Sequence, residues 1–247
     1  MGLARRKTGL LGLALMVVLL LSGCAEKPLP LSPEEQAIRQ ASITRGGRLY
    51  DNWYEEKASV GPRTTHRLYP TQAQFQGSIT WRCKECHGWD GYGRNGIYRG
   101  GPHYTFIQGV EDIDRMSDAQ VKAKLRGGHR FNSLLLAKDE TDLIRFMREG
   151  VVNMDRYIDR DDGRMRRGNV QQGAQRYQAL CESCHGSNGI KGPIVPLGMV
   201  ANREPWQTLH RILHGRPGIE NKPAMFTYGV ESAVDILAFL RTLPAQR

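Results

Sequence analysis

Cysteine is scarce in this sequence, and this scarcity excludes a fold held together by disulfide bonds. The 247 residues include only five cysteines. Four of them form two copies of the pattern C-x-x-C-H, at residues 83–87 and 181–185, which leaves Cys24 on its own. No pair of cysteines remains outside the two motifs, so the fold must be stabilised in other ways.

The sequence also lacks an apolar run that could cross a bilayer. The run near the N-terminus covers only residues 10–21, whereas a membrane-spanning helix needs about 20 residues. It follows Arg5, Arg6 and Lys7 and precedes small residues. A cationic start, a short apolar stretch and a small-residue cleavage site are typical of secretion signals. We therefore expect residues 1–23 to be a signal peptide.

The end of this signal, Leu21-Ser22-Gly23-Cys24, resembles a bacterial lipobox. In a lipobox the cysteine receives a lipid and becomes the first residue of the mature protein. We therefore expect Cys24 to be lipidated and the protein to lie in a bacterial cell envelope, anchored to a membrane and facing the periplasm. Ala25 resembles the signal for sorting to the outer membrane. The alternative is an ordinary signal peptide in which Cys24 has no role.

The two C-x-x-C-H motifs are typical of covalent haem c attachment. Their cysteines lie about one helical turn apart, so each sulfur can reach one porphyrin vinyl group, and the histidine can ligate the iron. The alternatives are a zinc site and a redox-active thiol pair. Zinc is disfavoured because the long stretch from Cys86 to Cys181 separates the two cysteine pairs. We predict two covalently bound haem c groups, attached to Cys83, Cys86, Cys181 and Cys184 and ligated by His87 and His185.

Basic residues outnumber acidic ones, and the formal net charge is +10. A basic surface favours anionic partners. Because an exported, lipid-anchored protein does not meet nucleic acid, we expect acidic redox partner proteins, contact with a membrane through the anchor, and no nucleic acid.

Composition and motif position divide the chain after the signal into five parts. Three prolines within residues 27–33 favour an extended tether. The helical pattern that follows is expected to break near Gly46 and Gly47 and to pack on the first haem domain. The five parts are a lipid-anchored tether (24–33), a helical extension and loop (34–76), the first haem c domain (77–154), a charged linker (155–169), whose residues Arg164, Arg166 and Arg167 are expected to be solvated, and the second haem c domain (170–247).

Helix start and stop signals occur in both haem domains. In the first, Ser117 and Gln120 predict a capping box, and a second helix is expected at about residues 139–149. In the second, helices are expected over residues 170–180, from Pro205 onward, and over about 231–243. Residues 142–147 and 235–240 in the two closing helices have parallel sequences, and each begins at a similar distance after its haem histidine.

Each half has the same order of elements, which is haem motif, loop, helix, second loop and closing helix. In this order both halves resemble the small class I cytochrome c fold, repeated in tandem over about residues 77–243. The resemblance implies an all-α protein with two tandem cytochrome c-like helical domains and a helical N-terminal extension. Residues 81–104 also resemble dihaem cytochromes of proteobacteria.

The resemblance implies a methionine as the sixth iron ligand, on the loop before the closing helix. In the second domain Met225 fits this position. Met199, which follows His185 much more closely on the glycine-rich loop, is the alternative. We expect His210 and His214, on the preceding helix, to be surface residues or to lie beside the haem propionates.

The first domain departs from the family pattern, because it has no methionine between Met116 and Met147. The corresponding loop offers His129, which follows His87 at nearly the same spacing as Met225 follows His185. The alternatives are His103, which lies much nearer to His87 in the sequence, and an iron with no sixth protein ligand. His66, in an earlier loop, is expected to be exposed.

This ligand set predicts an electron-transfer protein rather than an enzyme. A thioether ligand raises the reduction potential and a second imidazole leaves it lower. Electrons would then pass from a bis-histidine haem to a histidine–methionine haem. Two alternatives stay open, namely a dihaem enzyme (a peroxidase or a sulfur-compound dehydrogenase) and a haem subunit of a larger respiratory complex.

Overall fold

The structure, a computed structural model, describes residues 2, 30–219 and 223–246. Within these residues it contains nine α-helices and no β-strand beyond two isolated bridges, so the predicted all-α class is confirmed there. The helices are α1 (Pro33–Glu56), α2 (Cys83–His87), α3 (Asp118–Arg126), α4 (Ala137–Arg145), α5 (Val170–Leu180), α6 (Glu182–His185), α7 (Leu197–Arg203), α8 (Pro205–His214) and α9 (Val230–Leu240).

Five shorter helical turns complete the described secondary structure. Four are 3-10 turns, and one is a π-helical turn that extends α4. They are η1 (Gly77–Trp81), η2 (Glu111–Arg115), η3 (Phe146–Gly150, the π turn), η4 (Met154–Arg156) and η5 (Met225–Tyr228).

The expected signal peptide, Cys24 and most of the expected tether lie outside the described residues. Among the helices that are described, none combines the length and the apolar character needed to cross a membrane.

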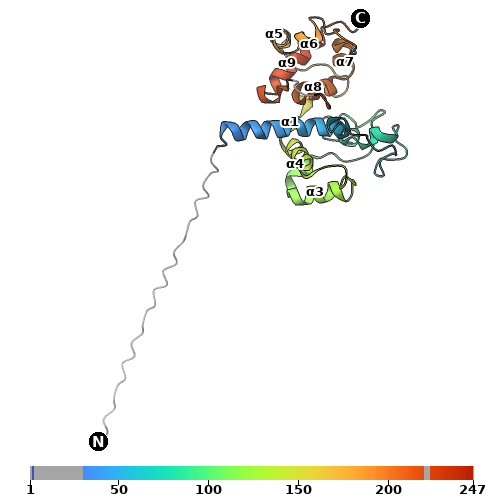
Figure 1. The fold of residues 1–247 in the computed structure, drawn as a ribbon, viewed down its shortest axis with the longest axis vertical. Helices are drawn as coiled ribbons and strands as arrows, with labels where there is room; N and C mark the ends of the chain where they lie inside the picture. Colours follow the sequence, from blue (N-terminus) through green and yellow to red (C-terminus); the bar gives the residue numbers. More distant parts are fainter. Residues whose placement is uncertain (1, 3–29, 220–222, 247) are drawn as a thin grey trace.

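Helix α1 lies between two groups of helices. Figure 1 shows α3 and α4 on one side of it and α5 to α9 on the other. The helix begins at a capping box between Ser32 and Glu35, in which each side chain accepts from the backbone of the other. It contacts α4 and η3 in the first half of the chain and α8 in the second. Helix α1 was expected to pack on the first haem domain only, and it also packs against the second half of the chain.

The predicted break of α1 at Gly46 and Gly47 is wrong. The helix runs through both glycines, and the residue with non-helical dihedrals is Asn52. The glycines allow close packing instead. A Cβ on Gly46 would lie 2.0 Å from the Asp142 carbonyl oxygen, and one on Gly47 would lie 2.5 Å from Cγ of His214. Because neighbouring residues on a helix point about 100° apart, the two glycines can serve two different partners.

The crossing of α1 and α4 has a close counterpart in α5 and α9. A Cβ on Gly173 would lie 1.9 Å from the Asp235 carbonyl oxygen. In the same way, a Cβ on Gly46 would lie 2.0 Å from the Asp142 carbonyl oxygen. The aspartate whose carbonyl faces each glycine also accepts a hydrogen bond at its carboxylate, from the residue one helical turn before that glycine. Ser42 Oγ donates to Asp142 (2.5 Å), and the Asn169 backbone N–H donates to Asp235 (2.7 Å).

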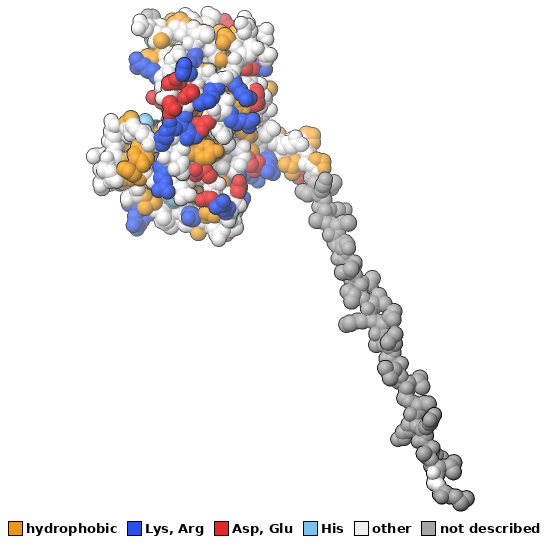
Figure 2. All heavy atoms as spheres, turned by 180° about the vertical axis from the view of Figure 1, so that it is seen from behind, with side chains coloured by type: hydrophobic (Ala, Val, Ile, Leu, Met, Phe, Trp, Pro, Cys, Tyr) orange, Lys and Arg blue, Asp and Glu red, His pale blue; other side chains and the backbone are white. Residues whose placement is uncertain are grey.

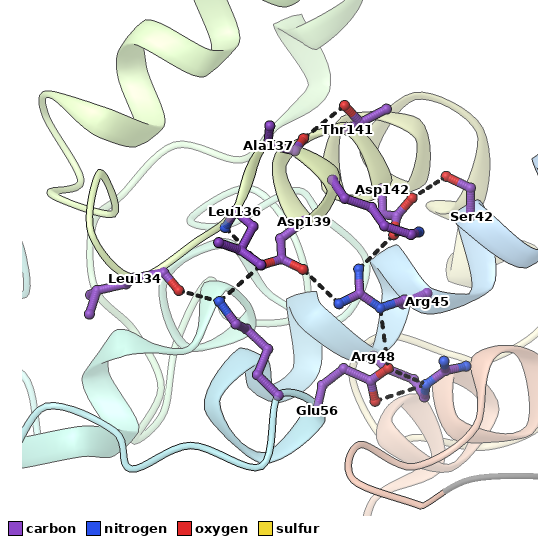
Figure 3. A network of polar contacts seen from close by, with 12 residues as sticks. Ser42, Arg45, Arg48, Glu56, Leu134, Leu136, Ala137, Asp139, Thr141 and Asp142 are labelled. Atoms are coloured by element: carbon purple, nitrogen blue, oxygen red, sulfur yellow. Dashed lines mark hydrogen bonds and ion pairs between the residues drawn. The ribbon is translucent and has the colours of Figure 1, made fainter.

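A network of charged side chains holds α1 against α4 (Figure 3). Arg45 on α1 donates to Asp139 and to Asp142 on α4, at 2.6 Å each. Lys57, just after α1, pairs with Asp139 at 2.9 Å. Burial alone would raise the pKa of Asp142, but hydrogen bonds from Lys138, Ser42 and Arg45 outweigh it and lower that pKa. Asp142 is thus held ionised by Lys138 of its own helix and by Arg45 of α1.

Apolar residues gather in two clusters, one within the first half of the chain and one mainly in the second half that also includes Trp89 and Tyr98. In the first, Trp53 of α1 and Phe131 pack with rings 5.8 Å apart, and Leu143 of α4 is part of the same cluster. In the second, Leu209 of α8 and Leu237 of α9 are fully buried.

The charged segment at residues 155–169 is folded rather than solvated throughout. Tyr157 and Ile158 are buried and belong to the second apolar cluster, and Ile158 forms an antiparallel bridge with Met165. The charges pair locally, as in Arg166 with Asp159 at 2.9 Å. Arg164, Arg166 and Arg167, for which a solvated linker was the expectation, are exposed. The role of the segment as a linker between two domains stays a prediction.

Most of the predicted helices are present. The capping box of Ser117 and Gln120 is confirmed, and so is Pro205 in the first turn of α8. The helix predicted at residues 170–180 is α5, with the same bounds. Helix α7 is an addition to the predicted elements, because its sequence lies in and after a glycine- and proline-rich stretch.

Candidate functional site

The first C-x-x-C-H motif forms helix α2 and opens onto a cavity of about 500 Å³. This volume lies in the range of about 300–1,000 Å³ that is usual for cofactor sites. Tyr50 of α1 also borders the cavity. Most of the wall is apolar, and its apolar residues include Trp81, Ile107, Val110, Ile113, Met116, Val121, Leu125, Phe131 and Met147.

Two imidazoles face this cavity from chain segments far apart in the sequence. His87 comes from α2 and His129 from the turn after α3, and their ring centroids lie 6.2 Å apart with planes at 38°. When two imidazoles bind one iron from opposite sides, each bond is about 2 Å and each ring centre lies about 1 Å behind its nitrogen, so the centroids are roughly 6 Å apart. The two planes can take different twists about the shared axis in such a pair.

Both imidazoles are oriented by bonds to backbone carbonyls. His87 Nδ1 donates to the Gln108 carbonyl at 2.8 Å, and His129 Nδ1 donates to the Lys124 carbonyl at 3.2 Å. A metal-bound histidine commonly uses its second nitrogen in this way, which fixes the tautomer. Each Nε2 is left for a ligand. Burial lowers the pKa of His87 to about 4, which keeps this ring neutral, as metal binding requires.

The residues of this first site therefore fit a haem group. Two thiols lie on one turn of α2, a neutral imidazole follows them, a second imidazole lies at the correct separation, and the wall is apolar. The structure brings His87 and His129 together, and the assignment of His129 as a ligand stays a prediction.

His103, the alternative ligand, lies elsewhere. Its Nδ1 bonds Glu85 at 2.9 Å, its ring stacks on Tyr98 at 4.6 Å, and it is not among the residues that border the cavity. This placement favours His129 over His103.

The expectation that His66 is exposed is wrong. The residue is 5% exposed, and its ring packs edge-on against Trp81 with centroids 4.4 Å apart. His66 also borders the cavity.

The second motif follows α5 and continues into α6. Its backbone repeats one feature of the first motif. Tyr177 donates its hydroxyl to the Gly186 carbonyl at 2.6 Å, and Tyr50 donates to the Gly88 carbonyl at 2.8 Å. Both glycines directly follow the motif histidine and have φ near +75°, a conformation that favours glycine.

Met225 is the first residue of η5 and is 4% exposed. It belongs to the second apolar cluster, against which Cys181 also packs. Cys184 is exposed and His185 is partly exposed. Met199, the alternative ligand, lies on α7 and is partly buried. The structure thus places Met225 and Cys181 around one core, and the ligation of iron by Met225 stays a prediction.

His210 and His214 are buried, so the expectation of surface residues is wrong, whereas a place beside the haem propionates stays a prediction. Each is 1% exposed, and α1 packs against this part of α8 through Gly47. His210 Nε2 donates to the Gly47 carbonyl at 2.9 Å, and its ring lies 5.0 Å from that of Trp89. The His214 ring lies 5.1 Å from that of Phe146. These two imidazoles join α8 to the first half of the chain.

Sequence reasoning missed the two tyrosines that brace the motifs. A usable signal was present, because Gly46 and Tyr50 have the same spacing as Gly173 and Tyr177. The signal was hidden by distance along the chain. Only residues 178–180 separate Tyr177 from its motif, whereas the much longer stretch 51–82 separates Tyr50 from Cys83.

Comparison with known proteins identifies one matching family. Residues 168–240 match the family model described as cytochrome c oxidase, cbb3-type, subunit III. No curated protein sequence matches the chain. The matched segment contains the second motif and ends in α9, and the match supports a class I-type cytochrome c domain there. It also supports a covalently bound haem c and a role in electron transfer.

Proposed function

We propose that the chain is a dihaem c-type cytochrome that transfers electrons and has two tandem cytochrome c-like domains. The observation that carries this proposal is the pair of imidazoles of His87 and His129, 6.2 Å apart across an apolar cavity next to a C-x-x-C-H helix. This first site lies outside the segment that matches the family model. The two halves are therefore supported by independent observations.

The repeated helix crossing supports the tandem arrangement. Close contacts at glycines place α1 on α4 and α5 on α9. In each half, a tyrosine one helical turn after that glycine donates its hydroxyl to the carbonyl of the glycine that directly follows the motif histidine. On this view α1 is the first helix of the first domain, and residues 57–82 are an insertion before its motif.

The thiols of each motif would hold the haem, which supplies a one-electron iron couple when bound. His87 and His185 would each provide one imidazole to it. His129 would act as the second imidazole at the first site and favour a lower potential, whereas the Met225 thioether would favour a higher one. We therefore propose that electrons move from the first site to the second and then to a partner.

Mass spectrometry of the mature protein tests the number of haems. Two covalent haems are expected, and a mass gain for one or none contradicts the proposal. The absorption band in the far red that marks iron–sulfur ligation tests the ligands. This band should disappear in Met225→Ala and persist in His129→Ala. Loss of the band only in Met199→Ala would mean that the wrong methionine has been assigned.

Carbon monoxide distinguishes a carrier from an enzyme. If His129 and Met225 each complete an iron's coordination, no position is left for a substrate that must bind the metal. The reduced protein should then bind carbon monoxide slowly and show no sustained peroxidase turnover. Rapid stoichiometric binding by the natural protein, or turnover, would favour a dihaem enzyme.

Lipid attachment at Cys24 would anchor the protein to a membrane on its periplasmic side. Two or more acyl chains anchor a protein stably, whereas one does so marginally. Cys24→Ser should release the protein into the soluble fraction. Retention of this variant in membranes after a high-salt wash would place the anchor elsewhere.

Acidic redox proteins are the partners we propose. The net charge is +10, although Figure 2 shows lysine and arginine side chains interspersed with acidic ones on the face in view. Attraction between unlike charges speeds association and weakens with salt. The electron-transfer rate with an acidic partner should therefore fall as ionic strength rises, and a salt-independent rate would contradict this choice of partner.

A second candidate function follows from the family match. The matching family is described as an oxidase subunit, so the alternative is that this chain is a haem subunit of a larger respiratory complex. Gentle solubilisation and size analysis distinguish the two functions. A free chain that still exchanges electrons supports the carrier, whereas consistent recovery in one large assembly supports the subunit.

A further inference from the structure

The segment between Tyr50 and Cys83, residues 51–82, has no equivalent in the second half, where residues 178–180 alone connect Tyr177 to Cys181. Although most of this segment lacks regular structure, it buries a histidine. His66 is 5% exposed and borders the first cavity beside His129. A buried polar side chain in a loop calls for an explanation, because its burial costs free energy unless its polar atoms are bonded.

The hydrogen bonds of His66 define its tautomer. The backbone N–H of Leu68 donates to His66 Nδ1 at 3.2 Å, so Nδ1 is an acceptor and the proton lies on Nε2. His66 Nε2 then donates to the His129 carbonyl at 2.9 Å. The proton that the neutral ring carries on nitrogen is thus directed at the backbone of the proposed ligand.

The imidazole of His66 is itself held firmly. Its own backbone N–H donates to Thr80 Oγ1 at 2.9 Å, and Thr80 is 2% exposed. The ring packs edge-on against Trp81 at 4.4 Å and lies nearly parallel to Phe131 at 6.2 Å. Trp81 is bonded in turn to the carbonyl of Thr64 at 2.7 Å. A side chain fixed on several sides can transmit a fixed position to the group it bonds.

The turn that presents His129 needs such support. The next residue, Arg130, has φ of +58°, a left-handed conformation that is unfavourable for a residue other than glycine. Within the turn, the backbone N–H and Nδ1 of His129 share one acceptor, the Lys124 carbonyl, at 3.1 and 3.2 Å. The bond from His66 is an anchor that comes from outside the turn.

We propose that His66 is a positioning residue that holds the His129 turn in place, so that the His129 imidazole stays directed at the first iron. The inference rests on the proposed function, in which His129 is the second ligand of that iron. The insertion after α1 therefore supports the turn after α3, and that turn carries the proposed sixth ligand of the first site.

Two substitutions separate the hydrogen bond from the packing. His66→Phe keeps an aromatic ring between Trp81 and Phe131 and removes the donor. His66→Gln loses the ring and keeps an N–H donor at a similar reach. Val60→Ala is the matched control, because it changes a side chain of the same segment that is 85% exposed. Thr80→Val, which removes the acceptor for the His66 backbone, is a milder variant that can be used if His66→Phe does not accumulate with haem.

The measurements are the rate of carbon monoxide binding to the reduced holoprotein and the electron paramagnetic resonance signal of the oxidised first haem. That signal is identified by its loss in His129→Ala. Because one ordinary hydrogen bond changes an equilibrium by about tenfold, His66→Phe should bind carbon monoxide about tenfold faster and shift the low-spin signal. His66→Gln and Val60→Ala should resemble the natural protein, and Thr80→Val should change in the same direction as His66→Phe by a smaller factor.

An unchanged binding rate in His66→Phe or, where that variant is not obtained, in Thr80→Val overturns the inference. Equal acceleration in His66→Phe and His66→Gln also overturns it, because packing and not the donor would then matter. If His129→Ala leaves both the signal and the binding rate unchanged, the ligand assignment itself is wrong, and this outcome is distinct from failure of the His66 variants alone.

Discussion

The two C-x-x-C-H regions share a helix crossing and a tyrosine brace but differ in enclosure. In the first, burial raises the pKa of Cys83 and of Cys86 to about 12. In the second, burial raises the pKa of Cys181 to about 11, and Cys184 is exposed.

The segment between the bracing tyrosine and the motif accounts for part of this difference in enclosure. It is long in the first region and provides His66 and Trp81 to the cavity wall. The comparison indicates that the crossing is the common frame and that residues 51–82 add wall residues to the first copy alone.

The strongest test of the common frame is to add one methyl group to each crossing. Gly46→Ala and Gly173→Ala should each destabilise the holoprotein by about 3 kcal/mol or more, because the new Cβ meets backbone oxygen rather than a movable side chain. Denaturant unfolding measures the effect. Gly100→Ala is the control, since nothing lies within 4 Å of a Cβ there. A large cost at only one crossing would show that the two are not equivalent.

Removing one charge from each closing helix should sharpen the difference between the halves. Asp142→Asn takes a nearly buried partner from Arg45 and Lys138 and should cost about 3 kcal/mol. Asp235→Asn affects a more exposed pair with Arg176 and should cost about 1 kcal/mol. The free energy of unfolding near neutral pH is the measurement. Equal costs would mean that the charged network of Figure 3 stabilises the first half no more than the single Asp235–Arg176 pair stabilises the second.

The join between the halves should weaken in acid because of His210. Burial is the main cause that lowers the pKa of His210 from its ordinary value of 6.5 to about 4. The unfolded chain therefore binds more protons between these values, so stability falls as the pH drops from about 6.5 towards 4. At a pH of about 4.5 the loss from this group is about 2 kcal/mol.

His210→Gln isolates this contribution. The amide can still donate to the Gly47 carbonyl but does not titrate, so the variant should match the natural protein near neutral pH and be more stable in mild acid. Unfolding curves at the two pH values measure the difference. Parallel pH dependence in the two proteins would assign the acid sensitivity to other groups.

The smallest expected effect concerns the tyrosine braces. Tyr50→Phe removes the hydrogen bond to the Gly88 carbonyl, and Tyr177→Phe removes the one to the Gly186 carbonyl. Each should lower the free energy of unfolding by about 1 kcal/mol. Tyr228→Phe, at a side chain that is 64% exposed, should have almost no effect. Thermal unfolding of the holoprotein resolves these differences. A cost for Tyr177→Phe alone would argue against the same brace in both halves.

Local sequence signals predicted much of the fold. The capping box at Ser117, the proline at the start of α8 and the bounds of α5 depend on nearby residues, and each is present. The resemblance of the second half to class I cytochromes is supported by the family match over residues 168–240. Such features are predictable because a few neighbouring residues determine them.

Features that depend on distant contacts could not be predicted in this way. Two adjacent glycines in a helical pattern predict a break, yet Gly46 and Gly47 are needed inside α1 because other helices approach it there. The burial of His66 and His210 depends on partners that are remote in the chain, at His129 and Gly47. Spacing from His87 indicated His129 as a candidate ligand, but no sequence pattern indicated that His66 would bond the His129 carbonyl.

The position of α1 limits how the molecule can be divided. The segment that matches the family model includes α8, whose His210 and His214 are covered by a helix from a much earlier part of the chain. If residues 168–240 were excised, or grafted onto another protein, both imidazoles would lose this cover. The second half is therefore not an exchangeable module, and any fragment or fusion designed from it must carry α1 or provide a substitute surface for α8.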